Sequence, residues 1–203
     1  MVEKHVSRPR KYDEGEVLAA AMRVFWTDGS GASTRRLAKA MGINQYSVYD
    51  CFKSKAGLFE QSLNRYIDDI VAGSVLLPLL QPEHAALTEL RQFLEGFVDT
   101  KDVDAPNGCF VCNTMIEASE HPIPVQRAIK RYRELVTKTF SRALKNEFPD
   151  MPRAVVRERS EFLFGAILGL FVQKKMGANG KPIQIFVDEI MASVERPFKS
   201  AHE

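Results

Sequence analysis

Apolar side chains recur every three or four positions along most of the chain, the spacing at which they line one face of an α-helix. Breaks in this pattern fall at glycine and proline, as at Gly29, Pro78 and Pro82. The pattern predicts helices over residues 13–28, 34–41, 45–51, 55–75, 83–99, 108–119, 123–148, 152–176 and 182–194. No stretch of useful length shows the alternation typical of a strand, and no internal repeat is apparent. The sequence therefore predicts an all-α fold.

The segment 34–55 predicts two short helices joined by a tight turn and followed by the start of a third. Leu37 and Met41 recur at helical spacing, and Val48 points inward from the second helix. Gly42 can adopt the left-handed conformation that ends the first helix. This arrangement is a helix-turn-helix, whose second helix lies in the DNA major groove with side chains near its start against base edges. Here those side chains are Gln45, Tyr46, Ser47 and Tyr49.

Helix starts on either side of this second helix offer sites for phosphate. Ser33 or Thr34 caps the first helix by accepting a hydrogen bond from unpaired backbone N–H groups. The Thr34 hydroxyl and the Arg35 guanidinium can instead contact a phosphate, because a helix N-terminus attracts anions. Lys55 opens the third helix and adds an ammonium group to the same kind of site. The alternative is that Lys55 only follows a capping Ser54 at an exposed helix start.

Basic residues gather ahead of this motif. The first eleven residues carry Arg10, Lys11 and two further basic side chains against a single acid, Glu3. Such an arm can reach phosphates or the minor groove, although on its own it would be interpreted as a solubilising tail. Residues 1–60 hold 10 Lys/Arg and 7 Asp/Glu, whereas the remainder holds 18 and 19. The excess of positive charge therefore accompanies the helix-turn-helix, as DNA binding requires.

Residues 8–60 resemble the DNA-binding domain of the TetR (tetracycline-repressor-like) family of bacterial regulators. The residues that carry the resemblance are Phe25, Trp26, Gly29, Leu37, Ala38, Met41, Gly42, Ile43, Tyr49, Phe52, Lys55, Leu58 and Phe59. The resemblance implies that Tyr49 and Lys55 contact phosphates and that Asn44 to Ser47 face the groove. The loop after Gly29 is one residue shorter than is usual in the family and lacks the aromatic residue that often follows this glycine.

The helix 152–176 is apolar on every side from Phe162 to Val172, so it must be covered by more than its own domain. Gly165 and Gly169 lie four apart on one face and allow another helix to approach closely. We interpret this helix and the last one as a four-helix dimer interface, a use that the TetR family also makes of its last helices. The predicted interface residues are Phe164, Gly165, Leu168, Gly169, Phe186 and Ile190.

Flexible or aromatic apolar residues on the central helices are candidates for a small-molecule pocket. They are Phe93, Phe97, Met115, Tyr132 and Phe162. For any single one of them, plain core packing is the more common role.

Cys109 and Cys112 share one helix face near a helix N-terminus, a place that lowers the pKa of a thiol. The pair can therefore be a redox or electrophile sensor, as a few TetR-like regulators are. The alternative, favoured by the apolar surroundings, is that both are small core residues. No metal site is expected, because only Glu117 and His121 are close enough in sequence to complete one with the pair.

Other classes of protein lack their signatures. There is no nucleophile elbow, phosphate loop or HExxH sequence, so no enzyme activity and no cofactor are predicted. No apolar run approaches the roughly 18 residues of a membrane span, and the start of the chain lacks a signal-peptide core. Three cysteines in 203 residues do not form a disulfide framework, which agrees with a cytoplasmic location.

Together these patterns predict a ligand-responsive regulator, most simply a repressor, made of a DNA-binding domain (residues 1–60) and an effector-binding and dimerisation domain (residues 61–203). A homodimer would bind a near-palindromic double-stranded operator and release it when a small molecule binds. The alternatives are a thiol-based sensor of the same architecture and a helical interaction module without DNA binding.

Overall fold

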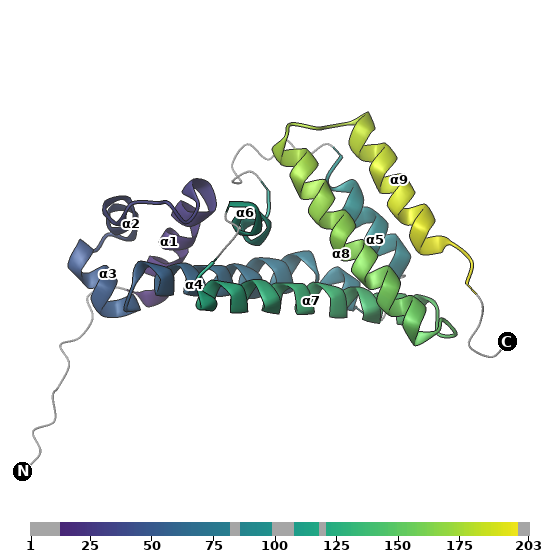
Figure 1. Ribbon diagram of the computed structural model, residues 1–203, viewed down its shortest axis with the longest axis horizontal. Coiled ribbons are helices and arrows are strands. Elements are labelled where there is room, and N and C mark those ends of the chain that lie inside the picture. Colours follow the sequence, from purple (N-terminus) through teal and green to yellow (C-terminus); the bar gives the residue numbers. More distant parts are fainter. Residues whose placement is uncertain (1–12, 82–85, 99–107, 118–120, 199–203) are drawn as a thin grey trace, which may run out of the picture.

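The computed structural model describes residues 13–81, 86–98, 108–117 and 121–198, which form helices and the loops between them (Figure 1). Within these ranges no residue lies in a strand, and the predicted all-α fold is confirmed. The molecule is elongated, with the N-terminal helices at one end and the last helix at the other. No helix in the described part of the chain is both long and apolar enough to cross a membrane.

Three helices form the N-terminal head: α1 (Glu14–Asp28), α2 (Thr34–Met41) and α3 (Gln45–Phe52). The side chain of Asp13 caps α1 by accepting a hydrogen bond of 3.0 Å from the N–H of Glu16. Gly42 ends α2 in the left-handed conformation, at φ 65° and ψ 22°, as the sequence predicts. The apolar faces of the three helices enclose a core that includes Phe25, Leu37 and Val48.

A long helical rod links the head to the rest of the molecule. Helix α4 (Lys55–Tyr66) continues directly into η1 (Ile67–Val75), which is wound as a π-helix, and a short 3-10 helix, η2 (Pro78–Leu80), follows. The sequence predicts a single helix over 55–75, and the change of winding within it is not visible in the hydrophobic pattern. In the wider helix the N–H of Leu76 bonds five residues back to the carbonyl of Val71, at 2.8 Å.

The remaining helices form the body: α5 (Ala86–Glu95), α6 (Phe110–Glu117), α7 (Ile123–Glu147), α8 (Arg153–Lys175) and α9 (Lys181–Glu195). Helix α7 lies alongside the α4–η1 rod, and α5, α8 and α9 pack together at the far end (Figure 1). Arg131 on α7 pairs with Asp68 and also donates to Asn64 Oδ1 at 3.1 Å, so part of the charged face of α7 is used against the rod.

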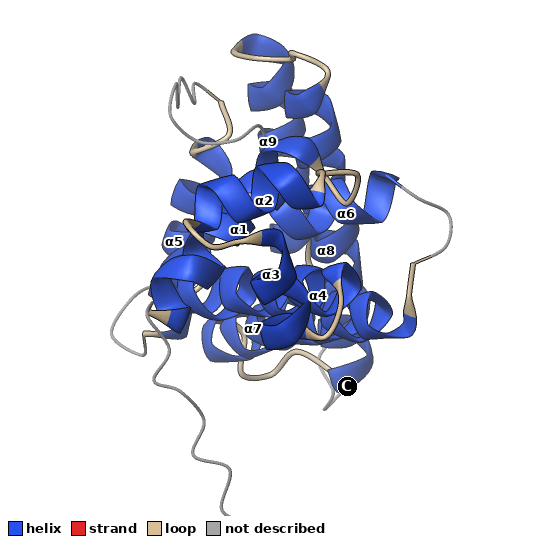
Figure 2. Cartoon of the chain, turned by 90° about the vertical axis from the view of Figure 1, so that its left-hand side faces the viewer, coloured by secondary structure: helices blue, strands red, loops and turns tan. Residues whose placement is uncertain are grey.

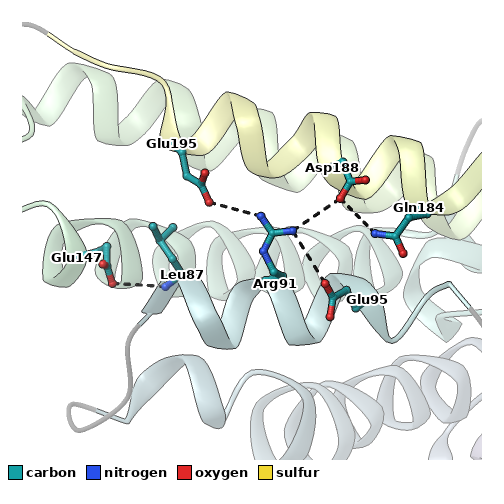
Figure 3. Close-up of polar contacts among 7 residues, drawn as sticks. All are labelled: Leu87, Arg91, Glu95, Glu147, Gln184, Asp188 and Glu195. Carbon is teal, nitrogen blue, oxygen red and sulfur yellow. Dashed lines mark hydrogen bonds and ion pairs between the residues drawn. The ribbon is translucent and has the colours of Figure 1, made fainter.

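Helix α9 is held against α5 by a charged cluster at the surface (Figure 3). Arg91 on α5 lies 3.7 Å from Asp188 and 3.6 Å from Glu195, both on α9, and 4.0 Å from Glu95 on its own helix. Such exposed pairs each contribute less than about 1 kcal/mol, so they orient α9 more than they stabilise it. Helix α9 is held in place mainly by its buried apolar side chains, among them Ile183, Val187 and Val194.

Buried apolar residues form one continuous cluster from α1 to α9. The predicted division at residue 60 falls inside α4, whose buried residues Leu58, Leu63 and Tyr66 belong to this cluster. The head and the body therefore share α4 as a common structural element.

Candidate nucleic-acid interface and regulatory core

Helix α3 lies at the outer end of the molecule, beside α2, and Figure 2 views that end directly. Tyr46 near its start is 83% exposed, and Asn44 and Gln45 are also exposed. Ser47 and Tyr49 belong to the same helix. An exposed large aromatic residue at the start of a helix that follows a tight turn is the arrangement that groove contact requires, and the described residues leave the Tyr46 side chain open to solvent.

The helix starts predicted to bind phosphate are capped by serine. The Ser33 side chain accepts a hydrogen bond of 3.2 Å from the N–H of Arg36, so Ser33 and not Thr34 caps α2. Ser54 caps α4 in the same way, accepting from Gly57 at 3.0 Å, and Lys55 is the first residue of that helix. The remaining N–H groups at these helix starts favour an anion.

The basic side chains at the start of α2 differ in exposure and in ion pairing. Arg35 is exposed at the start of α2, and Thr34 beside it is half-buried. Arg36, which the sequence does not single out, forms an ion pair with Asp28 at the end of α1. Arg10 and Lys11 lie outside the described residues.

Helix α6 is attached to the head at both of its ends. At its start, Trp26 Nε1 on α1 donates a hydrogen bond of 2.8 Å to the carbonyl of Gly108. At its end, the Glu117 carboxylate accepts one of 3.0 Å from the N–H of Ser30. Between these two contacts Phe110 is buried, with its ring centre 5.5 Å from that of Phe59 on α4. We call these three contacts the α6 clamp.

The α6 clamp gives Gly29 a second role besides ending α1. At φ 70° this residue has a backbone conformation that favours glycine. A side chain there would also place its Cβ 2.3 Å from Glu117 Oε1. The carboxylate of Glu117 therefore occupies space that only glycine leaves open.

Comparison with known proteins agrees with this architecture. Residues 17–61 match the family model described as bacterial regulatory proteins, tetR family. Over 185 residues the chain is 28% identical to the HTH-type transcriptional repressor ComR of Escherichia coli (strain K12). The aligned region covers 88% of this chain and 87% of ComR. These matches support membership of the TetR family. The chain is a DNA-binding transcriptional regulator with a helix-turn-helix head.

Solved structures of TetR-family proteins share the whole fold. One is a cysteine mutant of the regulator CifR in complex with 26-bp operator DNA, with 25% identity, a TM-score of 0.72, and coverage of 91% of this chain and 97% of that one. Another is the reduced form of NemR from E. coli, with 16% identity and a TM-score of 0.76, covering 91% of this chain and 98% of that one; it shows the fold alone.

The residues predicted to line an effector pocket fall into separate groups. Phe93 and Phe97 on the α5 side are 5.6 Å apart between ring centres, and Phe97 lies 4.9 Å from Phe171 of α8. Tyr132 is buried beside Cys109 instead. Two further predicted residues stand elsewhere: Met115 is half-buried on α6, and Phe162 is 46% exposed on α8.

The predicted dimer-interface residues are divided between the surface and the core. Gly165 has open space where a side chain would stand, and Leu168 is half-buried. Gly169 admits the ring of Phe186 from α9, whose nearest atom lies 3.4 Å from the place of a Cβ. Phe164 and Ile190 are buried within their own chain. A side chain covered by its own fold offers little surface to a partner, so for these two residues packing within the chain accounts for the apolar character, and their place in an interface stays a prediction.

Cys109 and Cys112 lie in a cluster that sequence reasoning did not foresee. The Tyr132 hydroxyl is 3.8 Å from Cys109 Sγ and 3.7 Å from Cys112 Sγ, and the hydroxyl of Tyr66 on α4 also forms a hydrogen bond with Cys109. Sequence reasoning also missed Trp26 and Glu117 of the clamp. A half-buried tryptophan was the available signal, because its N–H needs an acceptor.

Proposed function

We propose that this regulator is a homodimeric repressor that binds a near-palindromic operator through α3 and releases it when a small molecule binds the body. The observation that carries the proposal is the position of α3, which is exposed at the end of the molecule immediately after the Gly42 turn. The similarity to ComR, named a repressor, and to CifR, solved with operator DNA, supports it. The relatives are named as regulators, so we propose that the chain acts by binding and not by catalysis.

Within the head, we assign base contacts to Asn44, Gln45, Tyr46 and Ser47, which precede or open α3. Tyr49 and Lys55 are assigned to phosphates, together with the start of α2 (Ser33, Thr34 and Arg35). The basic residues Arg10 and Lys11 would add electrostatic attraction from the N-terminal arm. Phosphate contacts fix the register of the protein on DNA, whereas base contacts give specificity.

Lys55→Ala and Tyr49→Ala are expected to weaken operator binding about tenfold each, because each removes a phosphate contact. Lys55→Ala should also reduce the slope of log affinity against log salt concentration by about 1. Fluorescence anisotropy with DNA from upstream of the chain's own gene measures both effects. Lys130→Ala, an exposed lysine on α7, is the control that removes the same charge from the body. Unchanged affinity in both head variants would sink the assignment of the interface.

Dimerisation is assigned to the outer faces of α8 and α9. Phe162 on α8 and Ile185 on α9 are 46% and 55% exposed, so each has apolar surface that a second copy could cover. The absence of a side chain at Gly165 lets a second copy of α8 approach. A two-fold dimer would place two α3 helices on successive major-groove faces of the operator, one helical turn apart.

The α6 clamp supports a ligand response in the body. Helix α6 lies between the head and the body (Figure 1), so a molecule that shifts α6 pulls on Trp26 and Ser30 of the head. We assign the effector site to the aromatic group of Phe93, Phe97 and Phe171, which lies between α5 and α8. Such an effector lowers DNA affinity only by its own preference for the conformation that does not bind DNA.

Glu117→Ala is expected to speed amide exchange at Ser30 about 2- to 10-fold, the equivalent of losing about 0.5–1.5 kcal/mol from one hydrogen bond. Glu117→Gln is the matched control, since its amide oxygen can still accept from Ser30. Hydrogen exchange followed by NMR measures the rates. Equal exchange in all three proteins would show that the Glu117 contact does not hold the head.

A further inference from the structure

Cys109 and Cys112 lie at the start of α6, at the capping position and the third helical position, whose side chains are close together. The carbonyl of Cys109 accepts from the N–H of Asn113 at 2.8 Å, so Cys109 is the residue that caps α6, and Cys112 is the third residue of that helix. In this geometry the side chain of the capping residue meets the N–H of the third residue. Here the sulfur of Cys109 accepts from the N–H of Cys112, and Cys112 itself carries the second thiol.

The surroundings make the two thiols unequal. Burial raises the pKa of Cys109, but its hydrogen bonds with the thiol and N–H of Cys112, and with the hydroxyls of Tyr66 and Tyr132, outweigh burial and lower it to about 6. The pKa of Cys112 is raised by its hydrogen bond to Cys109 and by burial. The pKa values of both tyrosines are raised by burial and by the nearby Cys109 charge. These contacts favour the thiolate form of Cys109 over that of Cys112, so Cys109 is the more nucleophilic of the two sulfurs.

We propose that Cys109 and Cys112 form a reversible intrachain disulfide when a small peroxide reaches the cluster, and that this bond loosens the α6 clamp. The Cys109 thiolate attacks one peroxide oxygen, the O–O bond breaks, and the leaving hydroxide takes a proton to become water. The sulfur of Cys112 then attacks the sulfenic acid on Cys109, forming the S–S bond and breaking S–O. A second water leaves with the Cys112 proton. The two sulfurs lose two electrons and the peroxide gains them.

The position of Cys109 connects this chemistry to the head. Gly108, the preceding residue, has φ 81° and accepts the hydrogen bond from Trp26 Nε1. Phe110, the following residue, packs against Phe59 and Tyr66 of α4. A disulfide removes the negative charge that the Tyr66 and Tyr132 hydroxyls face and reshapes the first turn of α6. Contacts on both sides of Cys109 must then adjust, one to α1 and the other to α4.

Treatment of the purified chain with hydrogen peroxide, followed by thiol alkylation and peptide mass analysis, tests the bond itself. We expect Cys109 and Cys112 to become linked within one chain, lose reactivity toward the alkylating agent, and recover it after dithiothreitol. The Cys51→Ser variant should behave in the same way, whereas Cys112→Ser should stop at oxidised Cys109. A link to Cys51, a link between chains, or two thiols that stay reduced in the folded wild-type chain would overturn the proposal.

Fluorescence of the single tryptophan, Trp26, tests the coupling without DNA. Oxidation should change its emission reversibly in the wild type and in Cys51→Ser, and not in Cys112→Ser. Unchanged emission in a chain shown to carry the disulfide would refute the loosening of the clamp.

The effect on DNA rests on the proposed function and is measured separately. Operator affinity of the oxidised chain should fall on the order of 10-fold and return with dithiothreitol. If the reduced chain fails to bind operator, the proposed function fails while the mass and fluorescence results still decide the redox proposal. If the reduced chain binds and oxidation leaves its affinity unchanged, the disulfide does not regulate DNA binding.

Discussion

Replacement of Phe110 by alanine is expected to lower the free energy of unfolding by about 3–5 kcal/mol. The side chain is 1% exposed, and its ring lies edge-on to Phe59 at 5.5 Å and to Tyr66 at 5.8 Å between centres. Truncation removes this buried surface and leaves a cavity that rings on two other helices cannot fill without moving. Because the contacts of Phe110 join α6 to α4, the loss should also weaken the attachment of α6 to the head.

Urea unfolding followed by circular dichroism measures this loss. Ile116→Ala is the matched control, since Ile116 lies on the same helix and is 54% exposed. It should change the free energy of unfolding by no more than about 0.5 kcal/mol. If Phe110→Ala were as stable as Ile116→Ala, the contribution of Phe110 to the packing of α6 against α4 would be refuted.

The helices of the head could be predicted because their causes are local. An apolar period, a serine at the start of α2 and a glycine at its end all lie within a few residues of the bonds they make. The same is true of Gly29, whose positive φ of 70° ends α1. Short-range steric and hydrogen-bonding rules are sufficient for such features.

The α6 clamp could not be predicted, because its causes are not local. Trp26 and Gly108 are 82 residues apart in sequence, and Ser30 and Glu117 are 87 apart. Periodicity indicates which face of a helix is buried but not which helix covers it. The burial of Phe164 and Ile190 was not predicted for the same reason: the apolar pattern does not reveal which residues of α8 and α9 face the chain's own core.

The group formed by Cys109, Cys112 and the two tyrosines could be predicted only in part. The spacing of Cys109 and Cys112 at a helix start was visible in the sequence and already indicated a lowered pKa. The two tyrosine hydroxyls come from α4 and α7, so the sequence alone could not distinguish a reactive pair from core packing. The hydrogen bonds between the two cysteines, together with these hydroxyls, make the pKa values of the two thiols unequal, and this difference is the basis for the proposed redox response.

Ile185→Glu is expected to convert the proposed dimer into monomers, raising its dissociation constant by about 30-fold or more, the equivalent of at least about 2 kcal/mol at a residue central to the proposed interface. The side chain is 55% exposed on the outer face of α9, so a carboxylate there stays solvated in the monomer and the fold should survive. In a dimer the same carboxylate would be buried without a partner. Phe162→Glu on α8 should act in the same way, because Phe162 lies on the outer face of the neighbouring helix.

Sedimentation velocity over a range of protein concentrations measures the dissociation constant, and anisotropy measures the accompanying loss of operator affinity. Ile123→Glu is the control: Ile123 is 68% exposed at the start of α7, so the same charge is introduced onto an apolar position outside α8 and α9. It should remain dimeric and bind DNA normally. A wild-type chain that binds operator as a monomer would refute the interface, as would dissociation of Ile123→Glu while Ile185→Glu stays dimeric. Loss of DNA binding together with the dimer would instead show that the two heads act as a pair, since each monomer retains an intact α3 but occupies only one half of the operator.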